Sequence, residues 1–262
     1  MRFESKVVFI TGGTKGLGKA MAQAFLAEGA SVAVNSRSKE AVDRFAEELK
    51  GQQVLAFDTD IADHAAMEAM ASKVYETLGK VDILINNAGI VNPLAPSEKI
   101  KQDDFDRVID VNLKGTFYAT QAFGKRMIQQ GSGRIVSIAS QVALFGEKGF
   151  LPYAIAKSGL MLMTRQLAFE WSRHGVTLCA VAPGFIKGGM NEGLIRKEVF
   201  VNYLSGRTPM GRMGTVEELV STILFLASDD ARYINGETIV MDGGMTGFTA
   251  EGLLDFMSKG KQ

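Results

Sequence analysis

Tyr153 and Lys157 are the residues whose types and spacing most clearly indicate chemistry, and Ser140 lies thirteen residues before Tyr153. Side chains four residues apart share one face of a helix, so this spacing brings the Lys157 ammonium close to the Tyr153 phenol. The pKa of a phenol is about 10, and a neighbouring positive charge favours the phenolate and lowers that pKa. The pair therefore predicts a tyrosine that exchanges protons near neutral pH. On its own, the same spacing would more often mark a buried tyrosine beside a surface lysine.

A glycine-rich turn near the amino terminus supplies further context. It reads Thr11-Gly-Gly-Thr-Lys-Gly-Leu-Gly18, follows the apolar run Val7-Val-Phe-Ile10 and precedes a helical pattern that begins at Lys19. Its spacing is T-G-x-x-x-G-x-G rather than G-x-G-x-x-G. Glycines between a strand and a helix let the backbone approach a pyrophosphate at the helix N-terminus, so we expect a dinucleotide here. The predicted contacts in this turn are Gly12, Thr14, Lys15, Gly16, Leu17 and Gly18.

The end of the second apolar run indicates which dinucleotide binds. An acidic residue there would hydrogen-bond the ribose diol of NAD, whereas this chain has Asn35-Ser36-Arg37. Without a carboxylate, Arg37 can fork onto a 2′-phosphate, and Lys15 can approach that phosphate from the other side. NADP(H) is therefore predicted over NADH, with Ser36 also in contact. The alternative is that both cations are solvated surface residues.

Short apolar runs alternate with longer helical patterns along the chain. This alternation is typical of βαβ units, which build a parallel sheet covered by helices on both faces. Neither a proline- or serine-rich linker nor an internal repeat interrupts it. We predict one Rossmann-type, doubly wound α/β domain over residues 1–262, with a sheet of seven mostly parallel strands. The expected strands are Val7–Thr11, Ser31–Asn35, Val54–Phe57, Val81–Ile85, Arg134–Ile138, Val176–Ala180 and Thr238–Met241.

Two segments depart from this alternation. Residues from about 188 to 214 include a Gly-Gly-Met sequence and several apolar side chains, which is typical of a mobile lid or of an ordinary surface excursion. Residues from about 245 to 262 extend beyond the last strand and contain the apolar cluster Gly252–Met257. Because such a cluster is unfavourable in water, we expect the extension to dock on a neighbouring subunit or to cap the site.

The composition argues against several classes of partner. Lysine plus arginine equals aspartate plus glutamate at 29 each, so no net charge attracts nucleic acid or an anionic membrane. No run approaches the ~20 apolar residues that cross a bilayer. The lone Cys179 cannot form an internal disulfide, and we expect a cytoplasmic protein. His64, His174 and Cys179 lack the spacing of metal ligands, so no protein-built metal site is expected.

Several separated motifs together resemble the short-chain dehydrogenase/reductase family, from the first strand to about Gly244. The whole set agrees with the family in order and spacing. The motifs are Thr11-Gly-x-x-x-Gly-x-Gly18, Asp60-Ile61, Asn86-Asn-Ala-Gly89, Asn112 within Val111–Gly115, Ser140, Tyr153-x-x-x-Lys157, Pro183-Gly184, and Asn235-Gly236 before Asp242-Gly-Gly244.

The resemblance implies an NAD(P)-dependent alcohol or carbonyl oxidoreductase with a catalytic tetrad of Asn112, Ser140, Tyr153 and Lys157. Ser140 would donate a hydrogen bond to the carbonyl oxygen and Tyr153 would supply the proton. Asn112 would hold a water that connects Lys157 to solvent, and Lys157 would contact the nicotinamide ribose. The further implied cofactor contacts are Asp60 near the adenine, Ile61, Asn86, Ala88, Gly89, Tyr153, Lys157, Pro183, Gly184 and Ile186.

One departure from the family pattern follows Pro183-Gly184. The family usually has a threonine four residues beyond that glycine, where its hydroxyl helps to bind the nicotinamide carboxamide. This chain has Gly188 instead, so we expect backbone groups near Ile186 to replace that contact. The adjacent glycines 188 and 189 also predict a looser hinge for the excursion.

The predicted substrate pocket lies between Ser140 and Tyr153 and after Pro183. Lys148 and Lys187 either attract a carboxylate or phosphate or are solvated charges at its rim. A sugar acid or another polar ketone is expected, and a β-ketoacyl thioester, a steroid or a small cyclic ketone is the alternative. The pocket candidates are Ser140, Gln141, Ala143, Phe145, Lys148, Phe150, Tyr153, Phe185, Met190 and Leu194.

Two other functions are compatible with the same motifs. One is a dinucleotide-binding sensor or scaffold without turnover, which would not need Ser140, Tyr153 and Lys157 together. The other is a dehydratase or epimerase that uses the cofactor without net redox change. The resemblance also implies a homotetramer or homodimer, in which helices over residues 112–129 and 152–171 pair between subunits. Plain sheet-covering helices are the alternative for those segments.

Overall fold

The computed structural model describes residues 1–188 and 197–247. Within them, seven strands form one sheet in the order β3-β2-β1-β4-β5-β6-β7, and all neighbouring strands are parallel. The predicted doubly wound fold is confirmed. Met190, Leu194 and extension residues 248–262 lie outside the described residues. The strands are β1 Val7–Thr11, β2 Ser31–Ser36, β3 Val54–Asp58, β4 Ile83–Asn86, β5 Gly133–Ile138, β6 Val176–Pro183 and β7 Thr238–Met241.

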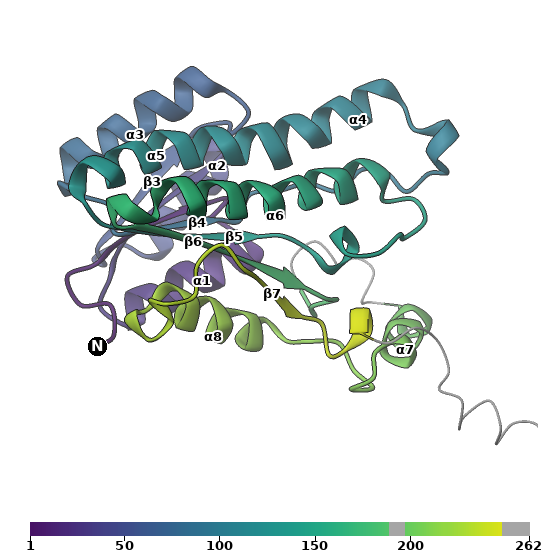
Figure 1. Cartoon of the computed structure of the whole chain (residues 1–262). Helices are drawn as coiled ribbons and strands as arrows, with labels where there is room; N and C mark the ends of the chain where they lie inside the picture. The colour runs from purple at the N-terminus through teal and green to yellow at the C-terminus, as the bar shows by residue number, and fades with distance from the viewer. Residues whose placement is uncertain (189–196, 248–262) are drawn as a thin grey trace, which may run out of the picture.

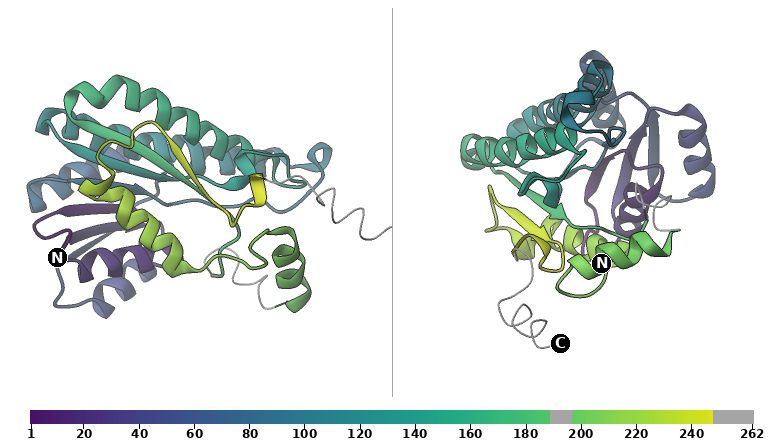
Figure 2. Two further views of the ribbon diagram at one scale, coloured as in Figure 1. Left: turned by 60° about the horizontal axis from the view of Figure 1, so that its bottom comes forward. Right: turned by 90° about the vertical axis from the view of Figure 1, so that its right-hand side faces the viewer.

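Helices cover both faces of the sheet (Figure 1). In that view α3, α5 and α6 lie above the sheet, while α1 and α8 lie below it. Figure 2 shows the same layers from two other sides. No helix in the described ranges is both long and apolar enough to cross a membrane. The α-helices are α1 Gly16–Ala27, α2 Lys39–Glu48, α3 His64–Leu78, α4 Gln102–Ile109, α5 Thr116–Gln130, α6 Leu151–Trp171, α7 Glu198–Arg207 and α8 Val216–Ala227.

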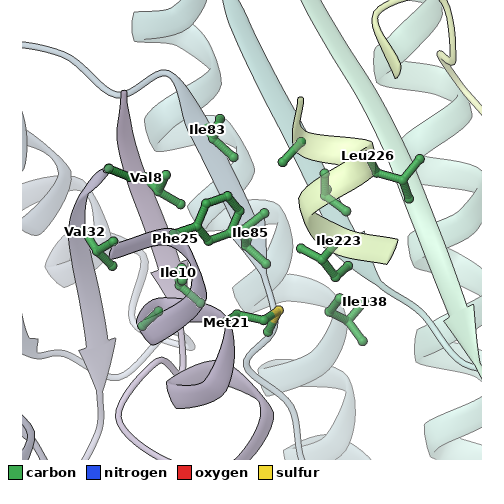
Figure 3. Packing of buried hydrophobic residues seen from close by; sticks show 14 of the residues in the cluster. Val8, Ile10, Met21, Phe25, Val32, Ile83, Ile85, Ile138, Ile223 and Leu226 are labelled. Atoms are coloured by element: carbon green, nitrogen blue, oxygen red, sulfur yellow. The ribbon is translucent and has the colours of Figure 1, made fainter. Parts of the chain in front are cut away.

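The continuous apolar run of β1 shows how one strand supports both layers. Successive side chains of a strand point to opposite faces. Val8 and Ile10 pack in the cluster that contains Phe25 of α1 (Figure 3). Phe9 points the other way and packs on Phe123 of α5, with ring centroids 4.4 Å apart. Each such side chain contributes about 1.5–3 kcal/mol when fully buried, so the sequence of β1 holds helices on both faces.

The winding of the sheet reverses between β1 and β4. The chain places β2 and β3 on one side of β1 and then places β4 to β7 on the other side. The loops after β1 and β4 therefore leave the carboxyl edge of the sheet in opposite directions, which opens a crevice there. Helix α7 lies beyond this same edge (Figures 1 and 2).

The two ends of the excursion expected at about 188–214 are held together by backbone pairing. Ile186 and Gly214 form a parallel bridge, and the Lys187 N–H donates to the Gly214 carbonyl at 2.9 Å. Within the described part of the excursion, α7 is joined to the loop before α6, because Arg207 Nη1 lies 3.0 Å from Glu147 Oε2. The excursion thus reaches over the loop that leads to Tyr153, and its movement as a lid stays a prediction.

Arg134 connects the sheet to the end of α8, a role that the sequence did not indicate. It begins β5 at the amino edge of the sheet and is 7% exposed. Its guanidinium donates to the carbonyls of Leu226, Ala231 and Ile234 at 2.6, 3.1 and 3.0 Å. A cation at a helix C-terminus also interacts favourably with the helix dipole. This side chain therefore supplies donors to carbonyls at the end of α8 and in the turn after it, and the Ala231 carbonyl also accepts from the Ile234 N–H.

We expect Arg134→Met to lower the free energy of unfolding by about 3–5 kcal/mol, because it removes a charged donor from three carbonyl oxygens, of which, within the described residues, only that of Ala231 keeps a backbone donor, the Ile234 N–H. Urea denaturation measures this loss. Arg232→Met is the matched control, since Arg232 is exposed and makes a single hydrogen bond to the Asp229 carbonyl. Its expected cost is below about 0.5 kcal/mol. Equal losses in the two variants would contradict the role assigned to Arg134.

Candidate dinucleotide and catalytic site

The glycine turn after β1 has a backbone that other residues would not tolerate. Gly12 has φ +65°, and a Cβ on it would lie 3.0 Å from the Cα of Ala88. A Cβ on Gly18 would collide with the Gly12 carbonyl oxygen. The predicted glycine spacing therefore corresponds to a turn that is packed closely on itself and on the loop after β4.

Helix α1 begins at this turn without a capping side chain. Its N-cap residue is Lys15, which makes no side-chain hydrogen bond to the helix. By contrast, Ser38 caps α2 and Thr215 caps α8 through their hydroxyl groups. The first N–H groups of a helix carry partial positive charge and need acceptors. The uncapped start of α1 and the close-packed turn fit the pyrophosphate of a dinucleotide.

Three polar residues without a predicted role, Thr11, Asn87 and Asn35, hold the turn in place. Thr11 Oγ1 accepts from the N–H groups of Asn87 and Ala88 at 2.9 and 3.0 Å. Asn87 Nδ2 donates to the Thr11 carbonyl at 3.0 Å. Asn35 Oδ1 accepts from the Gly12 N–H at 3.2 Å, and Asn35 is buried. The sequence did contain one indication of this role. An asparagine at the end of a buried strand, such as Asn35, needs polar partners to satisfy its amide.

The residues expected at the 2′-phosphate lie beside this turn. Thr11 pairs with Asn35 in the register of β1 and β2, so Ser36 and Arg37 emerge next to the turn that carries Lys15. Lys15 and Arg37 are exposed, and neither forms an ion pair within the described ranges. Two unpaired cations at one corner fit a phosphate.

The residues expected on the adenine side of the cofactor already make some contacts with other parts of the protein. Asp60 follows β3, accepts from the Ala62 N–H at 3.0 Å and lies 3.5 Å from Arg107 Nη2. Ile61 is buried where Gly115 passes close to its backbone. Asn86 at the end of β4 is buried, and no described group donates to its Oδ1.

Tyr153 and Lys157 both lie on the inner face of α6, as their spacing predicts. Tyr153 is 7% exposed and Lys157 is 2% exposed. Lys157 Nζ donates to the Ile138 carbonyl at 2.6 Å, and it lies 5.7 Å from the centroid of the Tyr153 ring. Ser140 follows Ile138 by two residues and hydrogen-bonds Tyr153. The end of β5 therefore brings three of the four predicted catalytic residues together.

Burial governs the protonation of this pair. It raises the pKa of Tyr153 to about 12, and the hydrogen bond with Ser140 opposes this rise. It lowers the pKa of Lys157 from 10.5 to about 8. The expectation that Lys157 lowers the pKa of Tyr153 is wrong for the protein by itself. The ammonium is directed at the Ile138 carbonyl, and loss of solvent outweighs its influence on the phenol.

Asn112 is fully buried, which excludes a role as a solvent-facing residue. It lies in a π-helical turn, Asp110–Gly115, between α4 and α5. Its Oδ1 accepts from the Ile90 N–H and its Nδ2 donates to the Ile90 carbonyl, both at 2.8 Å. A Cβ on Gly89 would lie 3.3 Å from Asn112 Oδ1 and 3.6 Å from Lys157 Nζ. Asn112 and Lys157 therefore meet at Gly89, and the expected water between Lys157 and solvent stays a prediction.

The residues predicted to line the substrate pocket differ in how deeply they are buried and in which part of the crevice they occupy. Gln141 is buried, and the Phe150 ring centroid lies 6.3 Å from that of Tyr153. Lys148 and Lys187 are exposed. Phe185 lines a cavity of about 840 Å³ bounded by the loops after β6 and β7 and by residues 208–214. Tyr153 and Ser140 do not line that cavity, so it lies beside the catalytic residues rather than over them. Ala143 and Phe145 are partly buried in the loop before α6.

Asn92 is a buried polar residue that no motif revealed. It is 4% exposed, and its Nδ2 donates to the carbonyls of Pro93 and Gly149, both at 2.9 Å. It thereby ties the loop after β4 to the loop before α6. The two segments are 57 residues apart, and a contact at that separation leaves no local pattern.

The glycine that replaces the family threonine has its own backbone requirement. Gly188 has φ +117°, a conformation that side chains with a Cβ rarely adopt. A Cβ there would also lie 3.2 Å from Val216 Cγ2. A threonine at this position would therefore have a strained backbone. For this reason Gly188→Thr would not simply restore the missing hydroxyl contact to the nicotinamide carboxamide.

Comparison with known proteins gives close relatives over nearly the whole chain. A family model described as enoyl-(acyl carrier protein) reductase matches residues 12–246. A 3-oxoacyl-[acyl-carrier-protein] reductase of Thermotoga maritima is 40% identical over 247 residues, which are 94% of this chain and 99% of the relative. A gluconate 5-dehydrogenase of Gluconobacter oxydans is 35% identical over 239 residues, which are 90% of this chain and 93% of the relative.

A solved structure agrees with these matches. It is a gluconate 5-dehydrogenase of Burkholderia cenocepacia in complex with NADP and tartrate, with a TM-score of 0.88 and 33% sequence identity. The match covers 95% of this chain and 98% of that chain.

The pKa of Lys157 predicts a specific pH dependence of stability. Its value is about 8 in the folded protein and 10.5 ordinarily, so the unfolded chain holds more protons between these values. Stability contributed by this group must therefore rise as pH increases from about 8 to 10.5. We expect the difference in unfolding free energy between wild type and Lys157→Met to show that rise. Urea denaturation across this pH range measures it, and parallel stability curves for the two proteins would contradict it.

Proposed function

The chain belongs to the short-chain dehydrogenase/reductase family, and we propose that it is an NADP(H)-dependent reductase of a polar ketone with Tyr153 as general acid and base. It is an oxidoreductase acting on CH–OH and carbonyl groups. The observation that carries the proposal is the burial of Tyr153 and Lys157 beside Ser140, next to a turn suited to pyrophosphate.

The dinucleotide, when bound, supplies or accepts the hydride. The turn and the uncapped start of α1 would hold its pyrophosphate, and Lys15 with Arg37 would select the 2′-phosphate. Asp60, Ile61 and the predicted contacts after β4 and β6 would line its remaining length. The preference for NADPH over NADH is supported by the pair of unpaired cations and by the absence of a carboxylate at residues 35–37.

The catalytic residues have complementary tasks. Ser140 donates a hydrogen bond to the substrate carbonyl and stabilises the negative charge that grows on its oxygen. Tyr153 keeps its proton at neutral pH because burial raises its pKa to about 12, and it gives that proton to the developing alkoxide. Lys157 is kept next to Gly89 and Asn112, the position from which it would assist proton supply.

A sugar acid or similar polar ketone is the substrate that we favour. The gluconate 5-dehydrogenases among the relatives support this class. The second candidate is a 3-oxoacyl thioester, favoured by the relative from Thermotoga maritima. NADPH consumption against sugar-acid ketones, 3-oxoacyl thioesters and cyclic ketones separates them, with NADH in parallel. A binding protein without turnover is disfavoured, because it would not need three catalytic residues buried together.

Tyr153→Phe tests the mechanism directly. We expect it to lower kcat by about 10²–10⁴-fold or more, because the proton donor is removed. The affinity for NADPH, measured by fluorescence titration, should stay near that of wild type. A rate close to wild type would overturn the assignment of Tyr153, whereas a loss of NADPH binding would indicate a structural defect.

Arg37→Ala tests the cofactor preference. Charged hydrogen bonds contribute about 1.5–3 kcal/mol, so the KM for NADPH should rise about ten- to a hundredfold. The KM for NADH should change little, since NADH lacks the 2′-phosphate. Lys39→Ala is the control, because Lys39 is a nearby exposed cation that pairs with Asp43. Equal losses for both cofactors in Arg37→Ala would contradict the proposal.

We also infer a homotetramer or homodimer that uses the outer face of α6. Ile155, Leu162 and Phe169 recur every seven residues on this helix, and Leu162 and Phe169 are 66% and 86% exposed. Phe117 of the adjacent α5 is also exposed. An apolar stripe of this size is unfavourable in water and supports pairing with a second copy of the chain. The cytoplasmic location stays a prediction.

A further inference from the structure

The side-chain amide of Gln141 is buried without good hydrogen-bond partners. Gln141 directly follows Ser140 and is 1% exposed. Its Nε2 lies 3.3 Å from Met245 Sδ, and no group in the described ranges donates to its Oε1. A thioether sulfur is only a weak acceptor. Both ends of the amide are therefore poorly satisfied in this conformation.

The amide lies where three strands of the sheet end. Gln141 begins the short helical turn after β5. A Cβ on Gly184, which follows β6, would lie 3.1 Å from Gln141 Oε1. Met245 belongs to the turn after β7 and is itself buried. The amide is thus enclosed by the segments that carry Ser140 and the predicted nicotinamide contacts.

A glutamine at this position lowers the stability of the folded protein, so folding by itself does not explain its presence. A buried acceptor without a donor costs free energy, and a methionine of similar length would avoid that cost. Across the described residues, the other unpartnered buried side-chain atoms belong to Asn86, Asn92 and Tyr75. Both asparagines also lie at the carboxyl edge, whereas Tyr75 lies on α3 beside Phe123 of α5. The unsatisfied amide oxygens of the described residues therefore all lie in or after strands at the carboxyl edge of the sheet.

We propose that Gln141 determines substrate specificity by hydrogen-bonding a hydroxyl group on the carbon next to the reacting carbonyl. The inference rests on the proposed function and names a feature of its substrate. Gln141 directly follows Ser140, and its amide lies beside Gly184 at the same edge of the sheet, so a substrate whose carbonyl is bound by Ser140 would have its neighbouring carbon within reach of a turned Gln141 side chain. The substrate class is an α-hydroxy ketone, which includes ketones derived from sugars and sugar acids.

A hydroxyl group matches this amide better than other substituents do. It donates to Oε1 and accepts from Nε2, whereas a carboxylate only accepts and the carbon chain of a thioester offers neither. Because Oε1 is enclosed in this conformation, the side chain must turn away from Met245 to reach the substrate. The hydrogen bond that this rotation breaks is the weak contact with the Met245 sulfur.

The experiment compares hydroxyacetone with butanone, in which a methyl group replaces the hydroxyl. The ratio of their kcat/KM values is measured with saturating NADPH for wild type, Gln141→Met and Gln141→Leu. We expect the ratio to fall about tenfold in both variants, the effect of losing one hydrogen bond of about 1.4 kcal/mol. The Tm of Gln141→Met should equal or exceed that of wild type, because an unsatisfied polar group is removed.

Tyr75→Phe is the matched control. It removes another buried side-chain oxygen that lacks a well-formed hydrogen bond, but one that lies on α3 beside Phe123 of α5 rather than next to Ser140. We expect the ratio of kcat/KM values to stay at the wild-type value in this variant. A similar fall in the ratio would show that the effect is not specific to Gln141 and would overturn the inference.

The outcomes separate the inference from the function on which it rests. Turnover of both ketones with an unchanged ratio in the Gln141 variants overturns the inference and leaves the proposed function intact. A Tm several degrees below wild type in Gln141→Met, with an unchanged ratio, shows a structural role instead. Absence of wild-type turnover with either ketone, together with failure on the sugar-acid panel, overturns the proposed function and the inference with it.

Discussion

The site depends on a reciprocal set of hydrogen bonds between the ends of β1 and β4. The Thr11 hydroxyl accepts from the backbone of Asn87 and Ala88, and the Asn87 side chain donates back to the carbonyls of Thr11 and Gly12. These bonds lie where the winding of the sheet reverses and its loops diverge. The pairing of the strands alone would not fix the position of the glycine turn relative to the loop after β4. The hydrogen bonds position the backbone for the cofactor and begin the route to the catalytic residues.

That route continues through buried contacts rather than through the sheet. Ala88 leads to Gly89 and Ile90, and the Asn112 side chain holds the backbone of Ile90 at both its N–H and its carbonyl. Asn112 reaches inward from a π-helical turn, a local irregularity that is frequent at functional sites. Lys157 Nζ faces the same side of Gly89 as the Asn112 side chain. The predicted cofactor turn and the predicted acid–base pair are therefore linked by a short series of half-buried contacts through Ala88, Gly89 and Ile90.

Much of the fold and of the candidate site could be predicted from the spacing of residues along the sequence. The strands, the glycine turn and the positions of Tyr153 and Lys157 follow from patterns a few residues long, and β1 and β7 have the expected bounds. Contacts between distant residues left no such pattern, as the bond from Asn92 to Gly149 shows. The pKa of Tyr153 was predicted in the wrong direction for the same reason. A neighbouring charge can be inferred from spacing, whereas loss of solvent depends on the packing of the whole crevice.

The protonation of the buried pair bears on the direction of the reaction. Burial favours the neutral form of each group, so Tyr153 retains its proton and Lys157 gives up its proton at lower pH than an exposed lysine would. A protonated phenol is the form that ketone reduction needs, since the alkoxide must be neutralised as it develops. Alcohol oxidation needs the phenolate, which this environment disfavours. Without the dinucleotide, burial therefore keeps the Tyr153 phenol protonated, and a positive charge close to it would favour the phenolate.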